Sequence, residues 1–199
     1  MRRPTSPGIA GLGRVCDDGA VNPDGPRREP LLGEWACLGI LYDEPAHGWA
    51  VVKQLRPDGD IGRIWHLSRP LTYRALEQLT GREWIRTVGE EPGAAGPNRT
   101  ILAATRSGRA RFRRWLRTPV PHLRDLRSEL LLKLVFAERH GIDIAETLDQ
   151  QRRLVDEQAE ALAAVTADED VVGLWRAEAT RAAARFLDRV HPGGPVADR

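Results

Sequence analysis

The stretch WHLSRPLTYRALEQLTGREWIRT, residues Trp65–Thr87, combines an apolar helical repeat with a polar beginning. Its apolar residues recur at the spacing of one buried helix face: Leu71, Ala75, Leu76 and Leu79. The side chains around the first turns are donors suited to phosphates and base edges: Ser68, Arg69, Thr72, Tyr73 and Arg74. Ser68 is suited to an N-cap, and Pro70 to a first turn that requires no amide donor. The stretch predicts a helix that presents donors to a polyanion.

Two shorter helical patterns precede this stretch. LLGEWACLGILYDEP, residues 31–45, has apolar residues close to a helical face and stops before Pro45. HGWAVVKQLRPDG, residues 47–59, predicts a second helix from about His47, which we interpret as a structural residue. We expect the following side chains to face inward: Trp49, Val52 and Leu55.

A hairpin is predicted after the third helix. Residues 84–90 and 99–104 are rich in β-branched side chains and flank the loop sequence PGAAGPN. A disordered linker is the weaker alternative. Thr105 is then placed to cap a helix, RSGRARFRRWLRT, whose apolar side carries Phe112, Trp115 and Leu116.

Three helices followed by a hairpin are typical of a winged helix-turn-helix, in which the third helix enters the major groove of DNA. The hairpin can then reach the flanking backbone or minor groove through Arg86 and Arg99. For Tyr73 two interpretations stay open, a phosphate contact through its hydroxyl and a half-buried core aromatic. For Arg69 and Arg74 we favour contact with DNA over solvated charge.

After Pro121 the pattern is entirely helical. These helices carry a larger apolar surface than an isolated pair of helices should leave exposed, so we expect a homodimer interface there. The residues expected to form it are Leu126, Leu130, Leu134, Val155, Leu162 and Val165. The alternative is that these stripes close on one another within a single chain.

Charge and composition restrict the class of protein. Residues 31–118 carry fourteen Lys and Arg against nine Asp and Glu, whereas residues 119–199 carry eleven against fifteen. A basic middle beside an acidic end is suited to a polyanion partner. No apolar run approaches the roughly 20 residues of a membrane helix, and no secretion signal is apparent. We therefore expect a cytoplasmic protein without a membrane partner.

The sequence offers little for catalysis. Its five His are scattered, and Cys16 and Cys37 have no zinc-ligand spacing. We expect no enzyme activity, no catalytic residues, no metal and no cofactor.

These observations predict a mainly α fold with a small β-hairpin wing. The expected organisation is a flexible N-terminal arm (1–30), a winged helix-turn-helix DNA-binding domain (31–118), a C-terminal α-helical dimerisation region (119–191) and a disordered tail (192–199).

The sequence resembles the PadR-like transcriptional regulators over about residues 31–165. The resemblance is carried by matched stretches in one order: LLG…LGIL (31–41), EPAHGWAVVKQL (44–55), IWHLSRPLTYRALEQL (64–79), GPNRTILAATRSGRARFRRWL (96–116) and LRSELLLKLVFA (126–137). Three positions depart from the family pattern: Glu83 replaces a common Gly, Leu102 a frequent aromatic and Arg74 a frequent Pro.

The resemblance implies a ligand-responsive, homodimeric bacterial repressor that binds a pseudo-palindromic operator in double-stranded DNA. It places Ser68, Thr72 and Tyr73 on the recognition helix, and Asn98 and Arg99 in the wing. With Trp35 and Trp175 it also suggests a pocket for a small planar aromatic effector, although Trp side chains are more often plain core. The alternative function is a winged-helix protein-interaction module without DNA binding.

Overall fold

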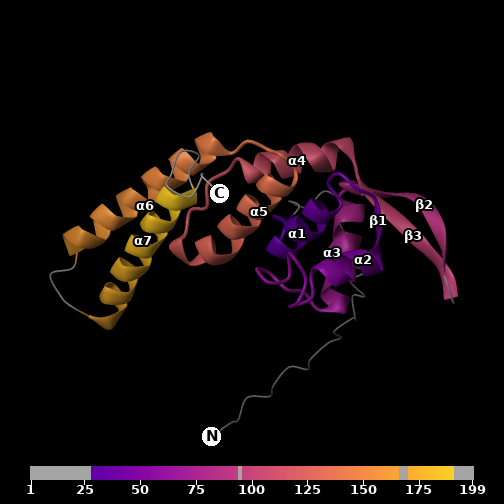
Figure 1. Cartoon of the computed structure of the whole chain (residues 1–199), viewed down its shortest axis with the longest axis horizontal. Coiled ribbons are helices and arrows are strands. Elements are labelled where there is room, and N and C mark those ends of the chain that lie inside the picture. Colours follow the sequence, from indigo (N-terminus) through magenta and orange to yellow (C-terminus); the bar gives the residue numbers. More distant parts are fainter. Residues whose placement is uncertain (1–27, 94–95, 166–169, 191–199) are drawn as a thin grey trace, which may run out of the picture.

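The computed structural model describes residues 28–93, 96–165 and 170–190 (Figure 1). Most of the expected N-terminal arm, including Cys16, and the tail from residue 191 onward lie outside the described residues.

Three helices form the first part of the fold, as predicted. They are α1 (Leu32–Ile40), α2 (Gly48–Gln54) and α3 (Arg69–Gly81). Their core contains Leu38, Leu55 and Leu79, all fully buried. His47 caps α2, because its Nδ1 accepts a hydrogen bond from the amide of Ala50 at 3.0 Å, so the structure gives this histidine a structural role.

The predicted hairpin is present as β2 (Ile85–Gly93) and β3 (Gly96–Ala104), which pair antiparallel. A short strand, β1 (Ala46–His47), pairs with the other edge of β3 and gives the sheet order β1-β3-β2. The hairpin extends from the helical body at one end of the molecule (Figure 1). It is the wing of a winged helix-turn-helix.

The helix α4 (Arg106–Leu116) begins as predicted, because Thr105 Oγ1 accepts from the amide of Gly108 at 3.0 Å. Its Phe112 packs against Phe136 of α5 (Leu131–Arg139) with ring centroids 5.5 Å apart. A Cβ added at Gly39 of α1 would lie 2.6 Å from Phe136, so the close packing of the Phe136 ring on α1 requires a glycine at position 39. The core of the winged part therefore continues into α5, past the boundary expected at residue 118.

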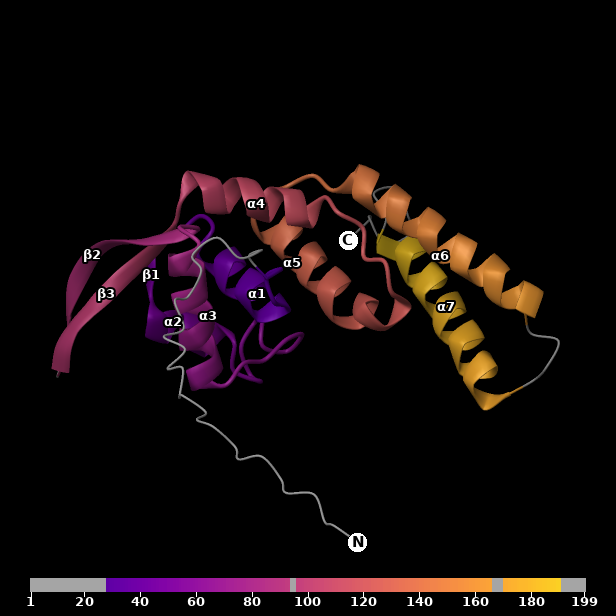
Figure 2. The ribbon, with the colours of Figure 1, turned by 180° about the vertical axis from the view of Figure 1, so that it is seen from behind.

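A second apolar cluster lies at the other end of the molecule (Figure 2). A 3₁₀ turn, η1 (Leu123–Asp125), and a π-helical turn, η2 (Leu126–Leu130), lead into α5. The long helices α6 (Ala145–Val165) and α7 (Val171–Val190) then form an antiparallel hairpin. Among the described residues, no helix is both long and apolar enough to cross a membrane.

Candidate nucleic-acid interface

The start of α3 exposes most of the predicted donors. Ser68 has the extended backbone of an N-cap, and its hydroxyl makes no cap hydrogen bond. Arg69, Tyr73 and Arg74 are exposed along the first two turns. The helix begins at the end of the winged module that lies away from α4, and the wing curves toward that same side (Figures 1 and 2).

Two expectations for this helix are wrong. Thr72 is fully buried, and its Oγ1 donates to the carbonyl oxygen of Ser68 at 3.1 Å. Leu71 is 52% exposed instead of buried. A threonine hydroxyl that bonds the carbonyl four residues earlier can occupy a core position without an unsatisfied donor. Thr72 therefore belongs to the buried face and is not available to a ligand in this conformation.

The outward face of α3 also includes residues that sequence reasoning missed. Glu77 and Gln78 are exposed one turn after Arg74. An exposed carboxylate repels phosphates, although it can accept a hydrogen bond from the cytosine amino group. The helical spacing of these residues from Arg74 was the available signal.

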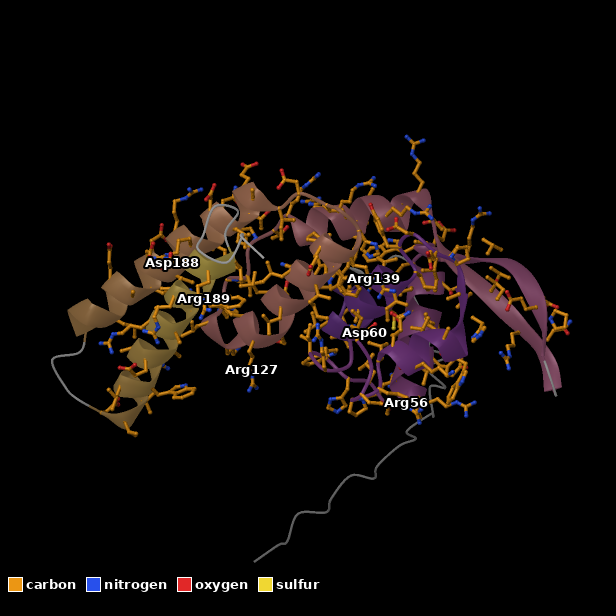
Figure 3. All side chains as sticks on the ribbon, viewed as in Figure 1. Arg56, Asp60, Arg127, Arg139, Asp188 and Arg189 are labelled. Atoms are coloured by element: carbon orange, nitrogen blue, oxygen red, sulfur yellow. The ribbon has the colours of Figure 1, made fainter. Side chains whose placement is uncertain are left out.

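Trp49 of α2 contradicts its predicted inward position, because it is 36% exposed. Its ring lies 5.6 Å from the guanidinium carbon of Arg69 and 5.9 Å from that of Arg56. Arg69 also lies 5.8 Å from the ring of Tyr73. Side-chain sticks place Arg56 at the end of the winged module that carries the start of α3 (Figure 3). Trp49 therefore lies between the predicted Arg69 and a second arginine, Arg56, in the loop that follows α2.

The wing carries both signs of charge. Arg86 is exposed and pairs with Ala103 across the strands, whereas Arg99 stands opposite Glu91. The Asn98 amide donates to Glu90 Oε2 at 3.2 Å. Arg86 and Arg99 are both exposed, whereas the Asn98 amide is occupied by Glu90, and contact of the three with DNA stays a prediction.

The turn between α3 and the wing has a specific geometry. The amide of Glu83 donates to the Thr80 carbonyl at 2.9 Å, and the amide of Trp84 donates to the Leu79 carbonyl at 2.9 Å. These two bonds form a Schellman motif, which requires a left-handed residue between them. Glu83 is that residue, with φ of 60°. Its position explains why the resembling family commonly has glycine there.

Some arginines of α4 form hydrogen bonds within the fold, and others are exposed to solvent. Arg109 Nε donates to the Tyr42 carbonyl oxygen at 2.7 Å, and Arg113 Nη1 donates to the Tyr42 hydroxyl at 2.9 Å. These two hold α4 against the end of α1. Arg106 is exposed at the start of α4 and directly follows Thr105, whose hydroxyl donates to the Glu83 carbonyl in the turn that ends α3.

Three of the residues expected at a dimer interface are buried within one chain. Leu126, Leu130 and Val155 belong to the second apolar cluster, where they pack with Leu148 and Leu187. Intrachain closure was the alternative, and it applies to these three. Leu134 and Leu162 are half-buried, and the side chain of Val165 lies outside the described residues.

The exposed apolar surface of this region lies on α7 instead. Val171, Leu174 and Trp175 are 79%, 61% and 72% exposed. Trp175 also lines a groove of about 1110 Å³ between η2, α6 and α7. The remaining lining is mainly apolar and includes Leu126, Leu130, Ala179, Ala182 and Phe186.

Trp35 and Trp175, predicted to share a pocket, do not meet. Trp35 stacks on Trp115 with centroids 5.1 Å apart and lies 5.4 Å from Trp84. It belongs to the core of the winged part, whereas Trp175 lies on α7 at the far end of the molecule. Within one chain, Trp35 therefore does not line the groove beside Trp175.

A polar network joins α4 to α5 beside this indole stack. Glu129 accepts from Trp115 Nε1 at 3.0 Å and pairs with Lys133 Nζ at 2.8 Å. Lys133 also donates to the Thr118 carbonyl at 2.6 Å. Burial lowers the pKa of Lys133 below 10.5, and Glu129 opposes this effect by stabilising the charged form.

The chemistry of metal or thiol sites is little represented in the described part of the chain. Three or more His, Cys, Asp or Glu side chains do not gather there in a group that could hold a metal. Cys37 is fully buried, and burial, followed by the charge of Glu34, raises the pKa of its thiol above the usual range. The Cys37 thiol is therefore protonated in the folded chain.

The chain is similar in sequence or structure to several proteins described as transcriptional regulators. A probable transcriptional regulator of Mycobacterium tuberculosis is 28% identical over 97 residues, which cover 48% of this chain and about half (49%) of the relative's length. PadR of Bacillus subtilis, solved in complex with operator DNA, has 16% identity and a TM-score of 0.42, covering 79% of this chain and 96% of that one. A PadR-like transcriptional regulator from Bacillus cereus has 20% identity and a TM-score of 0.37, covering 83% and 97%. No protein-family model matches the chain. The chain resembles PadR-like regulators, and its winged helix-turn-helix is seen directly in its helices and wing.

Proposed function

We propose that the protein is a sequence-specific DNA-binding transcriptional regulator that acts in the bacterial cytoplasm. The observation that carries the proposal is the exposure of Ser68, Arg69 and Arg74 at the start of α3, on the side toward which the wing curves. Donors on the first turns of such a helix can reach base edges, while Arg86 and Arg99 contact phosphates.

Selection from a random 20-bp duplex library, followed by gel shift at several salt concentrations, tests this function. We expect an enriched sequence whose affinity falls with salt by about 0.9 log units per log unit for each phosphate contacted. Arg99→Ala should reduce that slope by about 1, because it removes one cation. Arg114→Ala on α4 is the matched control and should leave the slope unchanged. Failure to enrich any sequence would refute sequence-specific binding.

The two-fold arrangement proposed for this regulator rests on α7. A homodimer can place two recognition helices about 34–36 Å apart, one turn of DNA. The exposed face of Leu174 and Trp175 gives a second copy an apolar contact surface. Sedimentation at micromolar concentration should give a dimer for the wild type and a monomer for Trp175→Glu. A monomeric wild type would end this part of the proposal.

We further propose that the regulator represses transcription and that a planar apolar compound releases it. The groove beside Trp175 offers an indole face and a largely apolar lining to such a ligand. A ligand weakens operator affinity only as far as it prefers the conformation that does not bind DNA. Tryptophan quenching by a panel of planar compounds, repeated with Trp175→Leu, tests the site, and gel shift with each hit tests the release. Transcription from the promoter that holds the enriched sequence tests repression.

A protein-interaction module without DNA binding is the second candidate. The acidic side chains on the same face favour it: Glu77 on α3, and Glu90 and Glu91 on β2 are exposed beside the predicted contacts. Such a module would show no enrichment of duplex sequences and no steep salt dependence, so the selection experiment separates the two functions.

A further inference from the structure

The start of α3 packs against the start of α2 through a cluster of two aromatic residues and two arginines around Gly48. Its members are Gly48, Trp49, Arg56, Arg69 and Tyr73. A Cβ added at Gly48 would lie 2.9 Å from Tyr73 Cε1, so the Tyr73 ring rests directly on the α2 backbone. The Arg69 guanidinium carbon lies 5.6 Å from the Trp49 ring centroid and 5.8 Å from that of Tyr73. The Arg69 side chain is therefore restrained by rings from two helices.

This restraint affects which part of the guanidinium is available. An aromatic ring attracts a guanidinium within about 6 Å of its centroid, through the ring face. The five N–H donors of arginine form a rigid planar fork, which binds a pair of acceptors in one geometry. Rings that restrain the side chain without accepting these N–H bonds leave the fork free for a partner. Arg69 itself remains exposed, and so does its partner Trp49.

The two arginines of the cluster differ in their restraint. Among the described residues, Arg56 lies near one aromatic ring, that of Trp49 at 5.9 Å, and it is on the loop that follows α2. A single ring contact on an exposed side chain leaves it free to follow a phosphate. Arg69, restrained by two rings on the first turn of α3, loses less rotamer freedom when it forms two hydrogen bonds with fixed geometry.

We infer that Arg69 is a specificity-determining residue that binds the O6 and N7 acceptors of a guanine, and that Trp49 is its positioning residue. Guanine is the base that offers two acceptors at the spacing of the arginine fork in the major groove. This inference rests on the proposed DNA-binding function and adds to it the identity of one base and the residue that holds its reader in place.

The probe for the test is the duplex that the wild-type protein enriches from a random library. We expect a guanine at one position of each half-site, and we expect 7-deazaguanine there to weaken binding, because it removes the N7 acceptor. Arg69→Lys keeps the charge but lacks the fork, so its preference for that guanine should fall roughly 5- to 150-fold. The matched control is Arg114→Lys, an exposed arginine of α4, which should leave the preference unchanged.

Trp49 is tested by the same measurement. Trp49→Leu should lower the guanine preference about 2- to 5-fold, the loss expected for one exposed cation–π contact, while Trp49→Phe retains an aromatic face and should restore most of it. The salt slope and melting temperature of both variants should match the wild type, which a general folding defect would not allow. Equal losses in Leu and Phe variants, or an unchanged base preference in Arg69→Lys, would overturn the inference while leaving DNA binding intact. Failure to enrich any duplex would overturn the proposed function and this inference with it.

Discussion

Replacing Glu83 by glycine should stabilise the protein. Glu83 occupies the left-handed position of the Schellman motif that ends α3, with φ of 60°. Its backbone contacts do not depend on the side chain: its amide bonds the Thr80 carbonyl, and its own carbonyl accepts from Thr105 Oγ1 at 2.8 Å. The Glu83 side chain is exposed and makes no ion pair with the described residues. The substitution therefore removes strain and little else.

The expected gain follows from two opposing effects. A residue with a Cβ pays roughly 1–2 kcal/mol in the left-handed helical region. Glycine loses more entropy on folding, which costs about 0.4–1 kcal/mol. The free energy of unfolding should rise by about 0.5–1 kcal/mol. For a chain of this size that corresponds to an increase in melting temperature of about 1–4 °C.

Thermal and urea unfolding of the full chain measure this gain. Glu83→Ala is the control, because it removes the carboxylate but retains the Cβ, and its stability should stay close to that of the wild type. If Glu83→Ala gains as much as Glu83→Gly, the charge and not the backbone is responsible, and the reasoning about strain fails. A less stable glycine variant would mean that the Glu83 side chain contributes to the wing in solution.

Three further outcomes are expected. Thr72→Val should change the free energy of unfolding by less than about 1 kcal/mol and leave base preference and salt slope intact, because the hydroxyl only bonds the Ser68 carbonyl; a changed base preference would place Thr72 in the interface after all. The pKa of Lys133 is lowered in the folded chain, so the unfolded chain binds this proton more tightly. The free energy of unfolding should therefore increase as the pH rises through the range just below 10.5. Urea unfolding should show that this increase is absent in Lys133→Met. In a Cys16→Ser background, a thiol reagent should label Cys37 only when the chain unfolds, since its thiol is buried and protonated; fast labelling of the native protein would contradict this.

Local signals were sufficient for the elements of the fold. The helix starts at Ser68 and Thr105 were predictable from capping residues, and the hairpin from its Pro and Gly loop. Whether an individual residue such as Thr72 or Trp49 lies on the buried or the exposed face of its helix could not be predicted in this way. Thr72 can be buried because its hydroxyl donates to a carbonyl one turn earlier, and the partly exposed Trp49 ring contacts two arginines instead of the apolar core. Both outcomes depend on partners that the hydrophobic period does not record.

Some residues expected at the dimer interface are covered within the chain, for a related reason. Apolar periodicity identifies a stripe but not the surface that covers it. Leu126, Leu130 and Val155 are covered within the chain by α6 and α7, and the stripe left exposed is that of α7, around Trp175. Trp35 was assigned to the same pocket because its helix was expected near the dimer core, and within the chain its ring packs against two other tryptophans.

The indole stack gives the two parts of the molecule a direct physical connection. Trp84 is the last residue of the Schellman motif that ends α3, and its ring contacts Trp35, which in turn stacks on Trp115. The Trp115 indole then donates to Glu129 in the π-helical turn η2. Leu126 and Leu130 of that same turn line the groove beside α7. π-Helical turns inside α-helices are frequently found at functional sites, and close-packed protein interiors transmit strain. The groove beside α7 and the end of α3 are therefore joined by a continuous series of side-chain contacts through η2 and three tryptophans.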